Sequence, residues 1–235
     1  MDTSSREVYK PLIISASDDN SKSTLQKLKN DPTLLIHDEI KTQVGDLIKL
    51  RNPQKRFSPS ELEEGIEDFF KSQSSTNYGN WVYYSWRHCL VHLLPEHEFV
   101  TVRTIRNRYV ITEEEQKTLA SKKIGIIGLS VGQSVALTLA LERGCGELRL
   151  ADFDTLELSN LNRIRTGVHN LGVKKSVIAA REIAEIDPYL NVVLYNEGVQ
   201  DDNIHDFFTQ GGDLDLLIEE CDSLEVKVKS RIKAK

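Results

Sequence analysis

Residues 123–163 decide the fold, and they read KIGIIGLSVGQSVALTLALERGCGELRLADFDTLELSNLNR. The stretch opens with a short apolar strand over residues 123–128 and turns through the loop Gly128–Gly132. A helix is predicted from Gln133 to Arg143, where a glycine ends it, and a second apolar strand follows over Leu148–Ala151. A strand, a helix and another strand in this order indicate two parallel strands joined by a right-handed crossover.

The same alternation continues toward the C-terminus. Asp187-Pro188 stops the next predicted helix, and the later strands lack polar alternation, as strands buried on both faces do. We expect helices over residues 174–186 and 201–210 and strands over residues 191–195 and 214–218. The pattern therefore predicts an α/β fold, with a Rossmann-like parallel sheet in a domain over residues 113–235.

Residues 1–112 have a mixed pattern and predict a smaller N-terminal α+β region, in which no motif indicates a role. Capping boxes at Ser58-Pro59-Ser60-Glu61 and at Thr112-Glu113-Glu114-Glu115 each predict the start of a helix. The other expected elements are helices over residues 21–31 and 33–50 and strands over residues 80–94 and 97–105. The helix that begins at residue 112 is expected to end near residue 121.

Composition excludes several classes of protein. The chain has 235 residues, of which 39% are hydrophobic and 28% charged, so we expect a globular protein with one large domain or two small ones. No stretch approaches the ~18 apolar residues of a membrane span. The net charge of −6 argues against a nucleic-acid partner, because a phosphate-tracking surface usually needs a basic excess.

The N-terminal sequence and the cysteines bear on cellular location. The N-terminus has no basic segment followed by an apolar run, so we predict no signal peptide. Cys89, Cys145 and Cys221 are far apart and form no disulfide or zinc pattern. A reducing cytoplasm is the simplest expectation.

The loop Gly128-Leu129-Ser130-Val131-Gly132 carries the first chemical signal. Gly128 suits a tight turn, and the helix behind the loop directs free N–H groups and partial positive charge toward it, which favours an anion such as phosphate. Asp152 and Asp154 follow the second strand, where a carboxylate can accept the hydroxyls of a ribose. The alternative is an ordinary turn with a solvated acid.

The loop matches neither of two common phosphate motifs. Ser130 and Val131 stand where a dinucleotide fingerprint has glycines, and no lysine follows Gly132 as a Walker loop requires. Lys174 and Lys175 open the following helix, where cations oppose the helix dipole. We interpret them as partners for phosphates, with a solvated lysine pair as the alternative.

From Ile124 to about Val228 the chain resembles the ThiF/MoeB/HesA family, the ubiquitin-activating-enzyme-like adenylyltransferases. The D-F-D strand end at Asp152–Asp154 and the S-N-L-N-R loop at Ser159–Arg163 follow the family's pattern without a gap, and Glu219–Asp222 resembles its later C-T-D-N segment. The resemblance covers about residues 101–235. The family continues beyond the equivalent of Asp222, so the resemblance implies that this domain is incomplete at its C-terminus.

The resemblance implies a role for each matching position. Asp152, with Asp154 beside it, would bind the ribose of ATP, and Asp222 would hold Mg²⁺. An arginine corresponding to Arg108, or else Arg106, would cross to the ATP of the partner subunit in a homodimer. The remaining predicted ATP ligands are the loop residues Gly128, Ser130 and Gly132 and the phosphate-binding residues Asn160, Arg163 and Lys175.

The resemblance thus implies an ATP- and Mg²⁺-dependent adenylyltransferase that activates a carboxylate, most simply the C-terminus of a small ubiquitin-like or sulfur-carrier protein. Arginine, lysine and a metal suit this reaction, because negative charge builds on the α-phosphate and on the leaving pyrophosphate. A related branch dehydrates threonylcarbamoyladenosine on tRNA. Two further hypotheses are a catalytically reduced nucleotide-binding or dimerising module and a dinucleotide-dependent oxidoreductase.

Two departures from the family bear on these expectations. Ser130, Val131 and Gln133 replace family glycines, and a β-branched valine tolerates positive φ poorly, so either ATP affinity is reduced or the loop uses other dihedral angles. Lys174 replaces a proline. Residues that suggest metal binding or a nucleophile, namely His88, Cys89, His92, His97 and Cys221, are expected to be packed or surface side chains instead.

Overall fold

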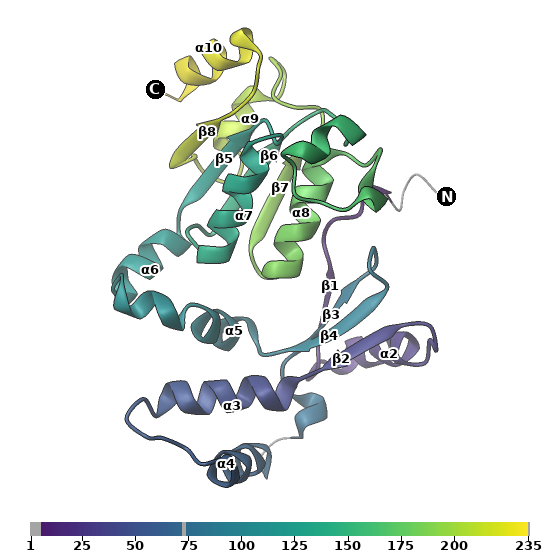
Figure 1. The fold of residues 1–235 in the computed structure, drawn as a ribbon, viewed down its shortest axis with the longest axis vertical. Helices are drawn as coiled ribbons and strands as arrows, with labels where there is room; N and C mark the ends of the chain where they lie inside the picture. The colour runs from purple at the N-terminus through teal and green to yellow at the C-terminus, as the bar shows by residue number, and fades with distance from the viewer. Residues whose placement is uncertain (1–5, 72–73, 235) are drawn as a thin grey trace. The chain divides into compact units, whose positions relative to one another are not determined.

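The computed structural model describes residues 6–71 and 74–234 (Figure 1). The chain forms two compact units. One is Pro11–Val110, and the other combines the chain before Pro11 with the chain from Ile111 onward. The first unit is therefore an insertion within the sequence of the second. The predicted division of the chain into domains over residues 1–112 and 113–235 remains a proposal.

A four-stranded parallel sheet forms the centre of the second unit and confirms the predicted α/β, Rossmann-like fold. Its order is β7-β6-β5-β8, and its strands are β5 (Lys123–Ile127), β6 (Glu147–Ala151), β7 (Asn191–Tyr195) and β8 (Leu216–Glu219). Ile126 stands opposite both Leu150 of β6 and Ile218 of β8. The carboxyl ends of all four strands consequently lie at one edge, where such folds bind ligands.

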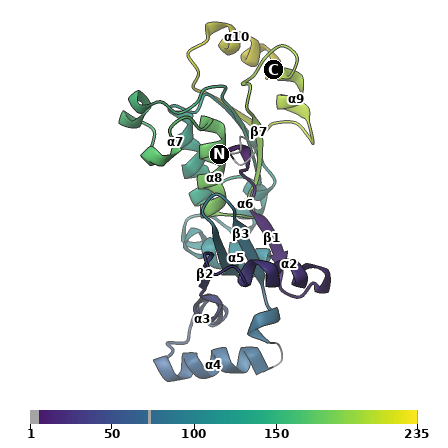
Figure 2. The same cartoon turned by 90° about the vertical axis from the view of Figure 1, so that its right-hand side faces the viewer.

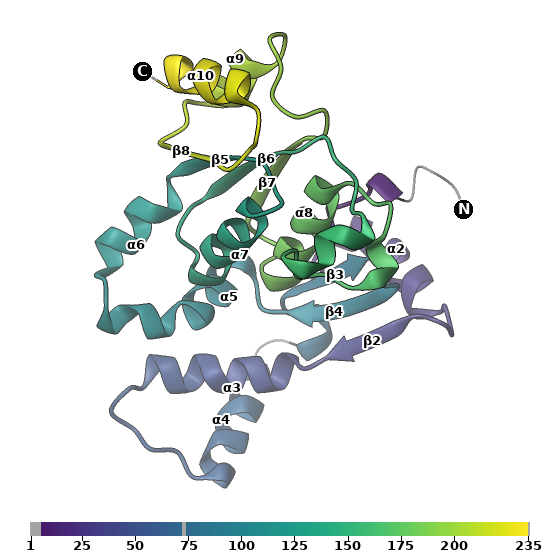
Figure 3. The same cartoon turned by 45° about the horizontal axis from the view of Figure 1, so that its top comes forward.

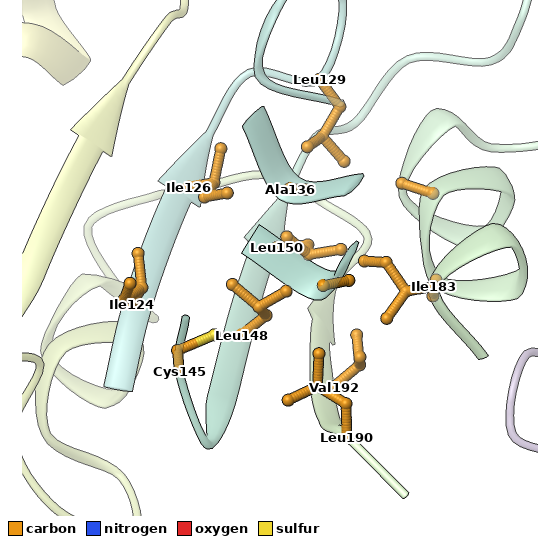
Figure 4. Packing of buried hydrophobic residues seen from close by; sticks show 13 residues of the cluster. Ile124, Ile126, Leu129, Ala136, Cys145, Leu148, Leu150, Ile183, Leu190 and Val192 are labelled. Carbon is orange, nitrogen blue, oxygen red and sulfur yellow. The ribbon is translucent and has the colours of Figure 1, made fainter. Parts of the chain in front are cut away.

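Helices cover both faces of this sheet. One face packs against α7 (Gly132–Glu142) and α8 (Lys175–Ile186), and the other against α9 (Ile204–Thr209) and α10 (Leu224–Lys233). Figure 2 shows α7 and α8 on the side of β7 opposite α9. Alanines at 136 and 140 let α7 lie close to Leu148 and Leu150 (Figure 4). A further helix of this unit, α6 (Glu113–Ala120), begins with the predicted capping box at Thr112.

The inserted unit is a second, mixed sheet with the order β1-β3-β4-β2. Helices α3 (Ile40–Arg51) and α4 (Pro59–Lys71) of this unit pack side by side through Gly45 and Ile66 (Figure 3). Its strands are β1 (Leu12–Ser15), β2 (Leu35–Asp38), β3 (Asn80–Tyr84) and β4 (Cys89–Leu93), and its helices are α2 (Asp19–Lys29), α3 (Ile40–Arg51), α4 (Pro59–Lys71) and α5 (Glu96–Arg103), with short 3₁₀ helices η1 (Ser75–Asn77) and η2 (Ile105–Tyr109).

Three predictions for the inserted unit are wrong. The strand predicted over residues 97–105 is mostly the helix α5, since Pro95 precedes a first turn that carries Glu96 and Glu98. The helix predicted over residues 33–50 begins only at Ile40, because the residues before it pair with β4 as strand β2. The single strand predicted over residues 80–94 is a hairpin of β3 and β4.

His92 illustrates why a histidine-rich strand need not bind metal. Its ring is buried and stacks on Trp81, with 4.1 Å between the ring centroids. Nδ1 lies 2.7 Å from Asp38 Oδ1, and Nε2 lies 2.7 Å from the carbonyl oxygen of Tyr78. Both nitrogens are therefore used in packing the sheet.

Within the described residues no helix has the length and apolar composition that a membrane crossing requires.

Candidate active site

The glycine loop after β5 is held against the ends of both neighbouring strands. Gly128 has φ of +88°, and its N–H donates to the carbonyl of Ala151 over 2.9 Å. A β-carbon on Gly128 would stand 2.8 Å from the backbone of Glu220 and from that of Cys221. Glycine is thus required here by the fold itself, in addition to any ligand.

Gly132 begins α7 and brings that helix close to the sheet. A β-carbon at this position would stand 2.8 Å from Cγ2 of Ile126. Since α7 starts at the loop, its first N–H groups face the carboxyl edge of the sheet, which is a favourable place for an anion.

The residues that replace family glycines do not strain the loop. Val131 has φ of −105°, and among the described non-glycine residues only His88 and Arg143 have positive φ. The loop therefore uses dihedral angles that valine tolerates, which is one of the two outcomes expected for Val131. Gln133 lies within α7, where it is buried and donates to Glu182 of α8 over 2.7 Å.

Asp152 ties the glycine loop to the turn after β6. One oxygen of its buried carboxylate accepts the N–H of Leu129 over 2.7 Å, and the other accepts the N–H of Asp154 over 2.8 Å. Each carboxylate oxygen has a further lone pair. Asp152 can therefore organise the loop and still accept hydroxyl groups from a ligand.

Lys175 connects three segments at this edge. Its ammonium group donates to Asp154 Oδ2 over 2.7 Å and to Ser130 Oγ over 3.2 Å, and its side chain is only 6% exposed. Lys174 points elsewhere and bonds the carbonyl of Asn196 and the carboxylate of Glu197. The φ of −57° at Lys174 also suits the proline that it replaces. Only the second lysine of the pair therefore belongs to the site.

Asn160 and Arg163 lie on η3 (Leu158–Asn162) and just after it. Asn160 is buried, and its side-chain oxygen accepts the N–H of Glu157 over 2.9 Å. Arg163 is exposed and donates to the side chain of Asn162 over 3.0 Å. Among the described residues, the hydrogen bonds that join Lys175 to Asp154 and Ser130 do not include Arg163.

The end of β8 supplies acidic groups. Asp222 is exposed, whereas the side chain of Glu219 is only 7% exposed and accepts bonds from the Cys221 N–H over 2.9 Å and from Lys227 over 3.2 Å. Burial opposes the charge of Glu219, but these two donors hold the pKa of the carboxyl below its usual range. Sequence patterns alone did not single out Glu219, although a doublet of acids at the end of an apolar strand is a usable signal.

Arg106 and Arg108 lie in η2 of the inserted unit and are exposed. Their assignment to the ATP of a partner subunit stays a prediction. The residues that the structure joins by hydrogen bonds or close approach are those of the Gly128–Gly132 loop with Asp152, Asp154 and Lys175. This arrangement combines a helix N-terminus, a buried cation and carboxylates, which suits a ligand with phosphate and hydroxyl groups.

Comparison with known proteins agrees with the geometry. The sequence model of the ThiF family matches residues 103–232. "Uncharacterized protein MT1398" of Mycobacterium tuberculosis (strain CDC 1551 / Oshkosh) is 42% identical over 217 residues, which are 92% of this chain and 28% of that protein. A probable molybdopterin-synthase adenylyltransferase of Porphyra purpurea is 32% identical over 111 residues, 47% of this chain and 28% of that protein.

A solved structure extends the likeness to three dimensions. The E. coli tRNA N6-threonylcarbamoyladenosine dehydratase superposes with a TM-score of 0.52 at 26% identity, over 56% of this chain and 54% of that chain. The chain spans only 28% of the length of each of the two curated relatives above.

Proposed function

Because this chain belongs to the ThiF family, we propose that it is an ATP- and Mg²⁺-dependent adenylyltransferase that activates a carboxylate. The observation that carries the proposal is the convergence of Lys175 with the glycine loop and the Asp152–Asp154 turn at one edge of the sheet. These groups come from two βα connections, β5 to α7 and β6 to α8, and their charges match the phosphate and ribose parts of a nucleotide.

Hydrogen-bond donors and a carboxylate acceptor along this edge would bind different parts of ATP. The phosphates would lie over the N-terminus of α7 and near Lys175, with Asn160 and Arg163 as further donors. The ribose would face Asp152, whose oxygens retain lone pairs. Arg108 is proposed to reach the ATP of a second subunit in a homodimer.

The chemistry needs little from the protein beyond positioning and charge. A carboxylate oxygen of the substrate would attack the α-phosphorus of ATP, forming a carboxyl–phosphate bond as the bond to the bridging oxygen breaks and pyrophosphate leaves. The nucleophile is already ionised, so no general base is required. Lys175 and Arg163 would stabilise the charge that builds on the α-phosphate and on the leaving group.

Asp222 fits the proposed magnesium role. Mg²⁺ usually keeps several waters and takes one or two carboxylates together with substrate phosphates, and the exposed carboxylate of Asp222 follows β8 at the ligand edge. When bound there, the ion would supply charge neutralisation for the phosphates.

For the substrate we propose the C-terminal carboxylate of a small ubiquitin-like or sulfur-carrier protein, in the cytoplasm. A similarity to a probable molybdopterin-synthase adenylyltransferase supports a protein substrate. The second candidate is dehydration of threonylcarbamoyladenosine on tRNA, which the similarity to the E. coli dehydratase favours. The net charge of −6 disfavours an RNA substrate.

Thermal unfolding with nucleotides tests the proposal. A ligand at about 100 times its Kd adds ~2.7 kcal/mol of stability, so Mg-ATP should raise the Tm by a few degrees while NAD should not. Arg163→Ala should abolish the shift, whereas Arg165→Ala, which removes another exposed arginine two residues away, should retain it. A shift with NAD alone, or none with either nucleotide, would contradict the proposal.

A further inference from the structure

We propose that Asp154 is a positioning residue for Lys175 rather than a ribose ligand, and that Ser130 donates a hydrogen bond to a phosphate oxygen. This inference rests on the proposed function and specifies how the same site recognises phosphate. It also gives Ser130, where the family has glycine, a role of its own.

The first step is the burial of Lys175. Its side chain is 6% exposed, and a buried ammonium group is costly unless a charge and hydrogen bonds compensate it. Asp154 supplies the compensating charge at 2.7 Å. The carboxylate of Asp154 is itself 49% exposed, so it meets the lysine at the surface of the site.

The second step is the backbone that fixes this pair. Thr155 and Lys174 form an isolated antiparallel bridge, and the N–H of Lys175 donates to the carbonyl of Asp154 over 2.9 Å. Asp154 and Lys175 are therefore joined through both main chain and side chain. An acid held in this way orients the ammonium group before any ligand arrives.

The third step is the direction of the bond to Ser130. An ammonium group can only donate, so the hydroxyl oxygen of Ser130 is the acceptor in the 3.2 Å contact with Lys175. The hydroxyl hydrogen of Ser130 then remains available to donate to another group. It belongs to the loop that precedes α7, where we place the phosphates of ATP.

Together these steps describe a connected set of polar groups. Asp154 orients Lys175, and Lys175 donates a hydrogen bond to the hydroxyl oxygen of Ser130. Ser130 and Lys175 each keep a proton that can be donated to a phosphate oxygen. A glycine at position 130 would allow closer approach of the backbone but would supply no side-chain donor. At position 130, the serine of this chain thus offers a hydroxyl donor to phosphate where the family's glycine allows close approach of the backbone.

Binding of Mg-ATP and of adenosine to the full chain, measured by calorimetry, tests both roles. Ser130→Ala and Ser130→Gly should each weaken Mg-ATP binding about tenfold, the effect expected for one hydrogen bond to a charged group. Ser130→Thr, which keeps the hydroxyl, should bind Mg-ATP nearly as well as the wild type. Mg-ATP binding by Ser130→Gly that equals or exceeds the wild type would overturn the role of Ser130.

The role of Asp154 is tested by the contrast between the two ligands. Asp154→Asn should weaken Mg-ATP binding by at least about tenfold and leave adenosine binding unchanged, because adenosine has no phosphate for Lys175 to contact. Asp202→Asn, at an exposed acid outside the site, serves as the matched control. Equal losses for Mg-ATP and adenosine would identify Asp154 as a ribose ligand and overturn the inference.

Failure of the inference and failure of the proposed function give different results. If the wild type binds Mg-ATP but the variants behave as the wild type, only the roles of Ser130 and Asp154 are refuted. If the wild type binds no Mg-ATP at all, the proposed function fails and the inference fails with it.

Discussion

Gly128 follows β5 and Cys221 follows β8, yet a β-carbon on Gly128 would stand 2.8 Å from the backbone nitrogen of Cys221. The glycine that begins the loop proposed to bind phosphate is therefore also the point where the end of β5 fits against the end of β8. Its lack of a side chain is needed for the packing of the sheet, and the contribution of this close approach to stability can be measured.

Gly128→Ala should destabilise the fold by about 3 kcal/mol, from a residue forced to positive φ and from a clash with rigid backbone. Gly211→Ala is the matched control, because Gly211 has a similar φ of +72° but nothing within 4 Å of an added β-carbon. The control should lose about 1 kcal/mol. Urea unfolding measures the free energy of unfolding of both variants, and equal losses of stability would show that the contact with the end of β8 is unimportant.

The core of the Rossmann-like unit could be predicted because its signals are local. Apolar strands such as Lys123–Ile127 and the capping box at Thr112 mark their own secondary structure in a few residues. The glycine loop and the acids after β6 are likewise adjacent in sequence to the strands that position them. These local features were enough to predict the sheet, and the location of the site remains a prediction.

Other features depend on contacts between distant residues. Val100 and Val102 favour a strand by their branching, but Phe99 and Val102 pack against the cluster of Ile40 and Val44 as part of a helix. The contact between Ser130 and Lys175 joins residues 45 positions apart. No local pattern encodes such a bond, so its chemistry could not be predicted from the loop alone.

Arg149 should be a major determinant of stability on the α9 side of the sheet. Its side chain is 1% exposed and donates to Glu147 Oε1 over 2.8 Å and to the carbonyls of Phe207 and Gly212 over 2.8 and 2.6 Å. Arg149→Met would remove these bonds and leave buried acceptors unsatisfied, which should cost about 3 kcal/mol in urea unfolding.

The exposed Arg165→Met is the control for Arg149 and should change the free energy of unfolding by less than about 0.5 kcal/mol. A similarly small effect at Arg149 would mean that water replaces the lost bonds.

Glu61 should remain ionised to unusually low pH. The backbone and hydroxyl of Ser58, with Lys55 beside them, lower the pKa of the Glu61 carboxyl to about 2. Because the folded-state pKa is depressed, the stability that Glu61 adds to α4 is fully present above the unfolded value of about 4.3 and is lost as the pH falls toward 2.

NMR titration of the Glu61 carboxyl group measures its pKa directly. Ser58→Ala removes the hydroxyl donor while the backbone N–H remains, so it should raise the pKa of Glu61 only part of the way to its usual value. An ordinary pKa in the wild type would show that the capping box does not persist in solution.

Cys221 should not act as a nucleophile, despite its place beside Asp222. Burial and the neighbouring Glu219 raise the pKa of the Cys221 thiol, and burial raises the pKa of Cys145 to about 12. Since the thiolate is the reactive form, neither cysteine should be alkylated readily by iodoacetamide at pH 7.5 in the native protein. Cys221→Ser should bind Mg-ATP with unchanged affinity, because no proposed contact uses the sulfur. Fast labelling of Cys221 protected by Mg-ATP, together with weaker nucleotide binding in the serine variant, would instead place this thiol in the active site.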